Sequence, residues 1–263
     1  MKPPPVGGGF LLFPLSPHSP DVAFPSQQEA IIIASPAPLE SATQTLELAL
    51  SSYRGSIVLA CSFGGPSGIV ILDLLHRAGE AVPLYYLDTD LLFKETYELV
   101  ERVSERYGID PIAVRPKQSL LEQQQRHGDA LWAHDPDACC ALRKVEPQTE
   151  FLREYRAWIT GIRRDQSATR SAVRALEWDE NFHLVKVSPL AEWTESDVWA
   201  YVREHDLPYN SLHDDGFPSL GCRPCTRRVA AGEDLRAGRW SGFTKTECGL
   251  HAPSLRTEST TRG

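Results

Sequence analysis

The chain has 263 residues and a formal net charge of −8 at pH 7, and 41% of its residues are hydrophobic. This composition is that of a globular protein with a sizeable apolar core, and the acidic balance disfavours a nucleic-acid partner because such partners select basic surfaces. No apolar run approaches the ~20 residues that a membrane-spanning helix needs, so we expect no membrane partner.

Residues 1–35 form a Pro/Gly-rich segment that includes Gly7-Gly8-Gly9. So much proline and glycine resists regular packing, and we expect a mobile N-terminal tail. The segment carries one lysine and a short apolar stretch broken by proline, with no clear small-residue cleavage site. It makes a poor signal peptide, and we therefore expect a cytoplasmic protein.

From residue 39 onward, amphipathic stretches alternate with short apolar runs. The spacing of apolar residues predicts helices at 39–53, 67–78, 93–107, 119–126 and 194–204. The apolar runs predict strands at 56–62, 83–88, 110–114, 157–161 and 183–187. Alternating strands and helices indicate an α/β fold with a mostly parallel sheet.

The chain becomes loop-rich after about Pro208, with Gly, Pro and Cys close together. We therefore expect residues 36–230 to form the main domain and residues 231–263 to form a C-terminal tail.

Polar turns follow three of the predicted strands. The first is Ser62-Phe63-Gly64-Gly65-Pro66-Ser67, in which the glycine pair allows backbone N–H groups to approach an anion at a helix N-terminus. The others are Leu87-Asp88-Thr89 and the stretch from Gly161 to Ser167, which contains Arg163, Arg164 and Gln166. Ligands of open α/β sheets bind beyond the carboxyl ends of the strands, and guanidinium groups suit phosphate and sulfate. An anion-binding crevice and ordinary strand-to-helix turns are both compatible with this pattern.

Four of the six cysteines form two pairs, Cys139-Cys140 and Cys222-Arg223-Pro224-Cys225. Cytosolic thiols stay reduced, so metal binding or catalysis is a better explanation than disulfides. Adjacent cysteines are uncommon as ligands of structural zinc sites. A cubane iron–sulfur cluster has four separate iron atoms, so neighbouring thiolates can each bind a different one. The pairs therefore favour a 4Fe–4S cluster over zinc or free buried thiols.

The other two cysteines lie apart from this set. Cys61 ends an apolar run and is expected to be a buried structural thiol. Cys248 lies near the C-terminus in a polar, Gly-containing segment, and spacing alone leaves it either an incidental thiol or a mobile nucleophile. Arg236 and Arg239 precede it and could hold a multiply charged substrate.

Taken together, these motifs resemble the bacterial assimilatory adenylylsulfate reductases over residues 39–251. The resemblance rests on Cys139-Cys140-Ala141-Leu142-Arg143-Lys144, Cys222-Arg223-Pro224-Cys225 and Glu247-Cys248-Gly249-Leu250-His251, with an arginine loop at 161–167 and a modified PP-loop at 62–65. It implies an adenine-nucleotide α-hydrolase-like (PP-loop) fold, a 4Fe–4S cofactor and adenosine 5′-phosphosulfate as substrate.

The resemblance also implies the mechanism. Cys248 would attack the sulfate sulfur and form an S-sulfocysteine, and thioredoxin would then release sulfite, in a pathway of sulfate assimilation and cysteine biosynthesis. Lys144 matches a lysine that lies between cluster and substrate in this family. The oligomeric state stays open, and a homo-oligomer is compatible with the sequence. The substrate-binding residues that the motifs and the resemblance predict are Ser62, Phe63, Gly64, Gly65, Leu87, Asp88, Thr89, Lys144, Gly161, Arg163, Arg164, Gln166, Arg236, Arg239 and His251.

The sequence departs from the family at Asp90, where a glycine is common, and we expect this carboxylate to alter the adenosine pocket. The segment before Cys248 is slightly shorter than in members of this family, and residues 239–243 contain one Trp where members often have two or three. Three alternative functions stay open: a reductase of the 3′-phosphorylated nucleotide, a tRNA-thiolating PP-loop enzyme and a zinc-stapled nucleotide-binding module. The first usually lacks the four cysteines, and the second normally carries Ser-Gly-Gly-x-Asp-Ser.

Overall fold

The computed structural model describes residues 41–251, so the N-terminal tail predicted over residues 1–35 and the end of the predicted C-terminal tail lie outside the described residues. A six-stranded sheet has the order β3-β2-β1-β4-β6-β5, and every neighbouring pair is parallel except β5 and β6. This confirms the predicted α/β class. The strands are β1 (Ile57–Ala60), β2 (Leu84–Leu87), β3 (Ile112–Val114), β4 (Ala157–Thr160), β5 (Leu176–Asp179) and β6 (Leu184–Val187).

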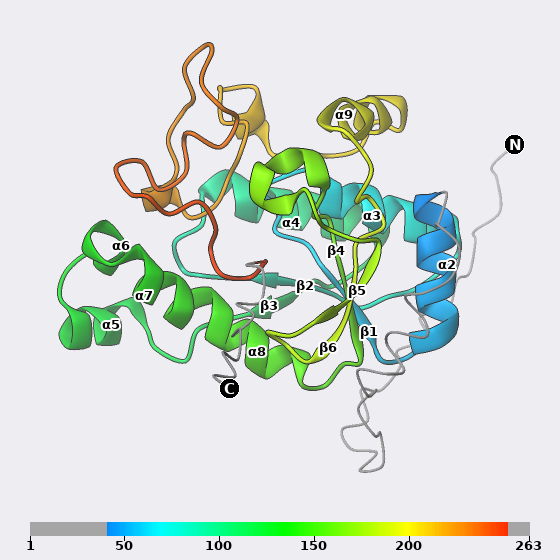
Figure 1. The fold of residues 1–263 in the computed structure, drawn as a ribbon, viewed down its shortest axis with the longest axis horizontal. Coiled ribbons are helices and arrows are strands. Elements are labelled where there is room, and N and C mark those ends of the chain that lie inside the picture. Colours follow the sequence, from blue (N-terminus) through cyan, green and yellow to red (C-terminus); the bar gives the residue numbers. More distant parts are fainter. Residues whose placement is uncertain (1–40, 252–263) are drawn as a thin grey trace, which may run out of the picture.

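The sheet separates two apolar cores, because successive side chains of a strand point to opposite faces. In β4, Ile159 belongs to the larger core, whereas its neighbour Trp158 belongs to the smaller one. The larger core lies under α2, α3, α4 and α9, and the smaller one lies under α8, as the layers in Figure 1 show. Burial on both faces explains why the central strands read as continuous apolar runs in the sequence.

The predicted helices are present, with ends that follow local capping. Ser119 and Thr194 each form a capping box with the acid three residues later, and Gly108 ends α4 with φ +63°. The helices are α2 (Ala42–Tyr53), α3 (Ser67–Arg77), α4 (Lys94–Tyr107), α5 (Leu120–His127), α6 (Leu131–His134), α7 (Pro136–Cys140), α8 (Glu146–Leu152) and α9 (Glu195–Glu204).

Two parts of the fold are absent from the sequence-based prediction. β5 is a four-residue strand at the edge of the sheet that pairs antiparallel with β6. Two of its residues are acidic, so its sequence contains no apolar run from which a strand could be predicted. Residues 131–152 form α6, α7, a π-helical turn (Ala141–Val145) and α8. Pro136 and Pro147 interrupt the helical pattern, but each lies at the start of a helix, where a missing N–H costs little.

Beyond α9 the described chain contains short 3-10 turns, Ser211–His213 and Arg223–Cys225, and no further helix or strand up to residue 251. This confirms the predicted loop-rich C-terminal part. It lies at one end of the sheet beside α6 and α7 (Figure 1). Within residues 41–251 no helix is both long and apolar enough to cross a membrane.

Candidate active site

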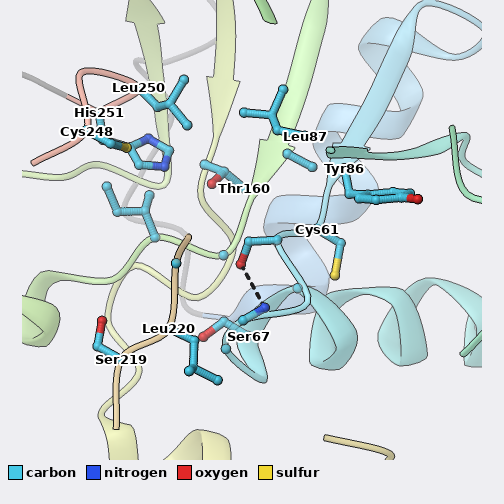
Figure 2. Close-up of a pocket in the computed structure, with 18 of the residues that line it drawn as sticks. Cys61, Ser67, Tyr86, Leu87, Thr160, Ser219, Leu220, Cys248, Leu250 and His251 are labelled. Atoms are coloured by element: carbon cyan, nitrogen blue, oxygen red, sulfur yellow. Dashed lines mark hydrogen bonds between the residues drawn. The ribbon is translucent and has the colours of Figure 1, made fainter. Parts of the chain in front are cut away.

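A cavity of about 260 Å³ lies at the carboxyl ends of β1, β2 and β4, where Ala60, Leu87 and Thr160 contribute to its wall. This is the place where open α/β sheets bind ligands. Figure 2 shows Cys248, Leu250 and His251 on one side of the cavity, with Tyr86 and Leu87 across from them and Ser67 and Leu220 below. Strand ends, the N-terminus of α3 and the C-terminal segment therefore enclose one space.

The turn after β1 forms part of this wall through Ser62, Gly64 and Gly65. A Cβ on Gly64 would lie 3.0 Å from the carbonyl oxygen of Leu220, so the glycine allows the C-terminal segment to approach the turn. Phe63, predicted to bind substrate, instead has φ +52° and a fully buried ring that contacts Tyr86 edge-on. Its side chain supports the turn from the core and does not line the cavity.

The loop after β4 is held tightly against the same turn. A Cβ on Gly161 would lie 2.7 Å from the Ser67 side chain, which explains the glycine at this position. Arg163 lines the cavity, but its side chain is 2% exposed and its guanidinium donates to Ser67, Asp165 and Glu195. Arg163 therefore fastens the loop to α3 and α9, and most of its donors are already occupied.

Arg164 points elsewhere. Its guanidinium pairs with Glu192 and donates to the carbonyl of Val173, and 40% of the side chain is exposed. Within residues 41–251, Arg164 is not among the residues that line the cavity. The two adjacent arginines thus have different environments, because Arg163 has an extended backbone whereas Arg164 begins a 3-10 turn (Arg164–Gln166).

Among residues 41–251, four cations besides Arg163 line the cavity: Lys144, Arg170, Arg236 and Arg239. Burial lowers the pKa of Arg236, and the positive charges of Arg170 and Arg239 lower it further, against an opposing effect of Glu247. Arg239 is held by the carbonyl of Leu220 at 3.0 Å. Such crowding of buried cations is favourable only where anions accompany them, so the cavity suits a multiply charged anion.

Arg170 was not among the predicted substrate-binding residues. It lies in a 3-10 turn (Ala168–Arg170) just beyond the stretch that was read as the arginine loop, and it is 8% exposed. Its position could have been inferred only from knowing that this turn folds back toward the C-terminal segment.

Cys248 lines the cavity and is half-buried. The segment around it is fixed on both sides. Glu247 accepts hydrogen bonds from Arg170 at 2.7 and 2.8 Å, and the ring of His251 stacks on Trp158 with 5.5 Å between centroids. Burial lowers the pKa of His251 well below its usual value, and Lys186 and two arginines add to this, so a neutral imidazole lies in the cavity at pH 7.

The four paired cysteines gather where α7 meets the C-terminal segment. Cys139 and Cys222 belong to one apolar cluster, and Cys225 packs against it. Burial raises the pKa of Cys139 to about 12, and the other three thiols of the group add to this effect. Within residues 41–251, no group of three or more His, Cys, Asp or Glu side chains is arranged to hold a single metal ion.

Lys144 lines the cavity beside these cysteines, of which Cys222 also contributes to the cavity wall. It is buried in the π-helical turn that follows Cys140. Burial alone would lower its pKa, but the thiols of Cys222, Cys248 and Cys140 raise it above the usual value. A charged amine therefore faces both the paired cysteines and Cys248.

The turn after β2 contributes differently from the prediction. Leu87 and Thr89 line the cavity, and the Thr89 hydroxyl is 3.2 Å from the Cys222 sulfur. Asp88 instead accepts hydrogen bonds from Tyr97 and Arg115, and among the described residues it is not part of the cavity wall. Its carboxylate stabilises the turn.

Asp90 adopts φ +56°, a backbone conformation that favours glycine, which accounts for the glycine that is common here. Its carboxylate pairs with the buried Arg143, which also donates to the carbonyl of Thr89 at 2.6 Å. Asp90 is not among the described residues that line the cavity, so the expectation that this carboxylate alters the adenosine pocket stays a prediction. Asp90 anchors the π-helical turn that carries Lys144.

The other predicted substrate-binding residues line the cavity: Ser62, Gly64, Gly65, Leu87, Thr89, Lys144, Gly161, Arg163, Gln166, Arg236, Arg239 and His251. The family pattern described as the phosphoadenosine phosphosulfate reductase domain matches residues 56–228. The chain belongs to this family. The resemblance to the adenylylsulfate reductases within it is confirmed by relatives of that name.

The relatives in this family cover most of the chain. An adenosine 5′-phosphosulfate reductase 1 of Bacillus subtilis (strain 168) is 46% identical over 89% of this chain and 97% of its own length. An adenosine 5′-phosphosulfate reductase of Staphylococcus haemolyticus (strain JCSC1435) is 48% identical over 81% and 87%.

Solved structures share the same fold. A crystal structure of phosphoadenylyl-sulfate reductase from Candida auris, in complex with phosphate, has a TM-score of 0.67 and 30% identity over 79% of this chain and 99% of its own. FMN adenylyltransferase of Candida glabrata has a TM-score of 0.54 at 18% identity, over 76% of this chain and 72% of its own. The second likeness concerns the fold alone, and together they confirm the predicted PP-loop type of nucleotide-binding fold.

Proposed function

We propose that this protein reduces adenosine 5′-phosphosulfate to sulfite and AMP in sulfate assimilation and cysteine biosynthesis, with thioredoxin as the electron donor in the cytoplasm. The observation that carries the proposal is the placement of Cys248 in a cavity lined by Lys144, Arg170, Arg236 and Arg239. A soft nucleophile among buried cations suits attack on the sulfur atom of an anionic sulfate group. The relatives named adenosine 5′-phosphosulfate reductase support this substrate.

The chemistry follows in two steps. The Cys248 thiolate forms a bond to the sulfate sulfur, the sulfur–oxygen bond to the phosphate breaks, and AMP leaves with the bonding electrons. A thioredoxin thiolate then attacks the Cys248 sulfur and releases sulfite, and the second thioredoxin thiol resolves the mixed disulfide. The dithiol supplies the two electrons that reduce the sulfur.

The cations have a direct role in the first step. The nucleotide and the thiolate are both negatively charged, so they come together only if positive groups offset their repulsion. Removing one charge-assisted contact typically costs about 1.5–3 kcal/mol, which is roughly a 10- to 150-fold loss in kcat/KM. The neutral His251 imidazole can donate a hydrogen bond from its N–H to the same anion without adding charge.

We further propose that Cys139, Cys140, Cys222 and Cys225 hold a 4Fe–4S cluster. The four thiols influence one another electrostatically, and thiolates of this kind are the usual ligands of such clusters. The bound group supplies a local charge that the buried Lys144 amine faces. The adjacent pair and the Cys-x-x-Cys pair come from α7 and the C-terminal segment, so the cysteines also join these two parts of the fold.

The nucleotide preference tests the proposed function. Purified protein with reduced thioredoxin is expected to release sulfite from adenosine 5′-phosphosulfate with a higher kcat/KM than from the 3′-phosphorylated nucleotide. Because Asp90 pairs with Arg143, repulsion by that carboxylate is not the basis of this expectation. Equal or better use of the 3′-phosphorylated nucleotide would reverse the assignment of the substrate, and no sulfite from either would refute the function.

The two arginines after β4 are expected to differ when each is replaced by alanine. Arg163→Ala removes three contacts of a buried guanidinium, so we expect lower thermal stability together with a loss of kcat/KM on the order of 10-fold or more. Arg164→Ala removes a half-exposed ion pair with Glu192, and we expect less than about a threefold change. Steady-state kinetics and thermal unfolding of both variants provide the measurement. A larger kinetic loss in Arg164→Ala than in Arg163→Ala would contradict this assignment.

A further inference from the structure

Glu247 precedes Cys248 directly and is the acid of the C-terminal segment that meets the cavity arginines. Its carboxylate receives two hydrogen bonds from Arg170, at 2.8 and 2.7 Å, and a third from Arg236 at 3.3 Å. The side chains of Glu247 and Arg170 are each 10% exposed. This is a buried, two-pronged ion pair, the geometry in which a carboxylate–arginine contact is strong and directional.

The receiving surface is built for this carboxylate. Thr169 and Ser167 place hydroxyls 3.2 and 3.5 Å from the same Glu247 oxygen that Arg170 contacts. Burial raises the pKa of Glu247, but the hydrogen bonds and positive charge of Arg170, together with the charge of Arg236, hold that pKa below its usual value. Arg170, Thr169 and Ser167 come from the loop after β4, far from Glu247 in the sequence, whereas Arg236 belongs to the same C-terminal tail. A surface glutamate with an incidental partner would not be enclosed in this way.

Both arginines also line the cavity, as does Cys248, whereas Glu247 is not among the described residues that do. Glu247 therefore contacts the cavity cations from outside the cavity, while the next residue enters it. We propose that Glu247 is a positioning residue that docks the segment around Cys248 onto Arg170 of the loop after β4, with Arg236 of the same tail beside it, and so holds the Cys248 sulfur in the cavity. The catalytic meaning of this inference rests on the proposed function, but the docking contact itself does not.

The contact has a consequence for the two chemical steps. Attack on the nucleotide requires Cys248 inside the cavity, whereas the S-sulfonated residue must become accessible to a second protein. The docking contact must therefore form before the first step and break before the second. Removing the carboxylate is expected to slow the first step and leave the second unimpaired.

Glu247→Gln keeps the side-chain volume and removes the charge. Without any nucleotide, alkylation of Cys248 by iodoacetamide, followed by mass spectrometry of its peptide, is expected to become at least about tenfold faster, because the segment undocks more often. The matched control is Glu233→Gln, which breaks an ion pair with Arg227 in the same part of the chain. That variant is expected to alkylate at the wild-type rate.

A second measurement uses adenosine 5′-phosphosulfate without thioredoxin. The single-turnover rate of S-sulfonation is expected to fall at least about tenfold in Glu247→Gln, while nucleotide affinity changes less than about threefold. Sulfite release from adduct already formed is expected to proceed at the wild-type rate or faster. Wild-type alkylation of the variant would overturn the inference, and so would tighter nucleotide binding with faster S-sulfonation, which would make Glu247 a competitor of the substrate. If the wild-type protein forms no adduct, the proposed function fails, and the alkylation result still decides on docking.

Discussion

Replacing Cys248 by serine is expected to abolish sulfite formation while nucleotide binding persists. Cys248 lies in the cavity with the cations that would hold the substrate, and these contacts do not depend on its sulfur. A serine hydroxyl has no comparably accessible anion at neutral pH, so the nucleophile is lost without loss of shape. The measurement is steady-state sulfite release, together with nucleotide binding by calorimetry.

The same experiment identifies the adduct. Wild-type protein incubated with adenosine 5′-phosphosulfate and no thioredoxin is expected to gain one sulfite-sized mass on the peptide that contains Cys248. Reduced thioredoxin should remove this mass as sulfite appears. An active Cys248→Ser protein, or an adduct on another cysteine, would refute the assigned nucleophile.

Cys61 provides the control, because it also borders the cavity. Burial raises the pKa of its thiol to about 12, so the reactive thiolate is scarce at neutral pH. A Cβ placed on Gly68 would lie 2.7 Å from its sulfur, which shows how closely this thiol packs against α3. Cys61→Ser is therefore expected to reduce stability more than it reduces catalysis.

The parallel core was predictable from the sequence because its strands are buried on both faces. Runs such as Ile57–Ala60 are continuously apolar, as expected for strands buried on both faces, and helices such as α5 and α9 begin with clear capping residues. β5 was missed since an edge strand with acids carries no such signal. The helices between 131 and 152 were missed because each begins with a proline or is only a turn or two long.

The cavity was predictable in position but not in every side chain. Strand order brings the turns after β1, β2 and β4 to one edge, so glycine-rich and polar turns identify the site. Local backbone angles decide which of two adjacent side chains points into the cavity. For this reason Arg163 is buried at the cavity whereas Arg164 is half-exposed, and the Phe63 ring packs in the core. The contribution of Arg170 depends on a tertiary contact with Glu247, which no local pattern records.

Replacing any one of Cys139, Cys140, Cys222 or Cys225 by serine is expected to remove iron and activity together. The hydroxyl is a hard ligand and a poor substitute for thiolate at an iron–sulfur cluster. Loss of the cluster should also disturb the cavity wall and so reduce activity. Cys222 follows Ser219 and Leu220 of that wall, and its sulfur lies 3.2 Å from the Thr89 hydroxyl. A cysteine that merely filled space would tolerate serine with a modest loss of stability, which is the result expected for Cys61→Ser.

The decisive measurement is metal and sulfide analysis of anaerobically purified protein, together with its visible spectrum. We expect about four iron and four sulfide per chain in the wild-type protein, as the cluster type requires, and brown colour that each ligand variant loses. The Cys61→Ser and Cys248→Ser proteins should retain the iron, the sulfide and the brown colour, because neither sulfur belongs to the four-cysteine group. Stoichiometric zinc with iron near zero would refute the cluster. Full activity in a ligand variant that has lost its iron would show that the cluster is dispensable for catalysis.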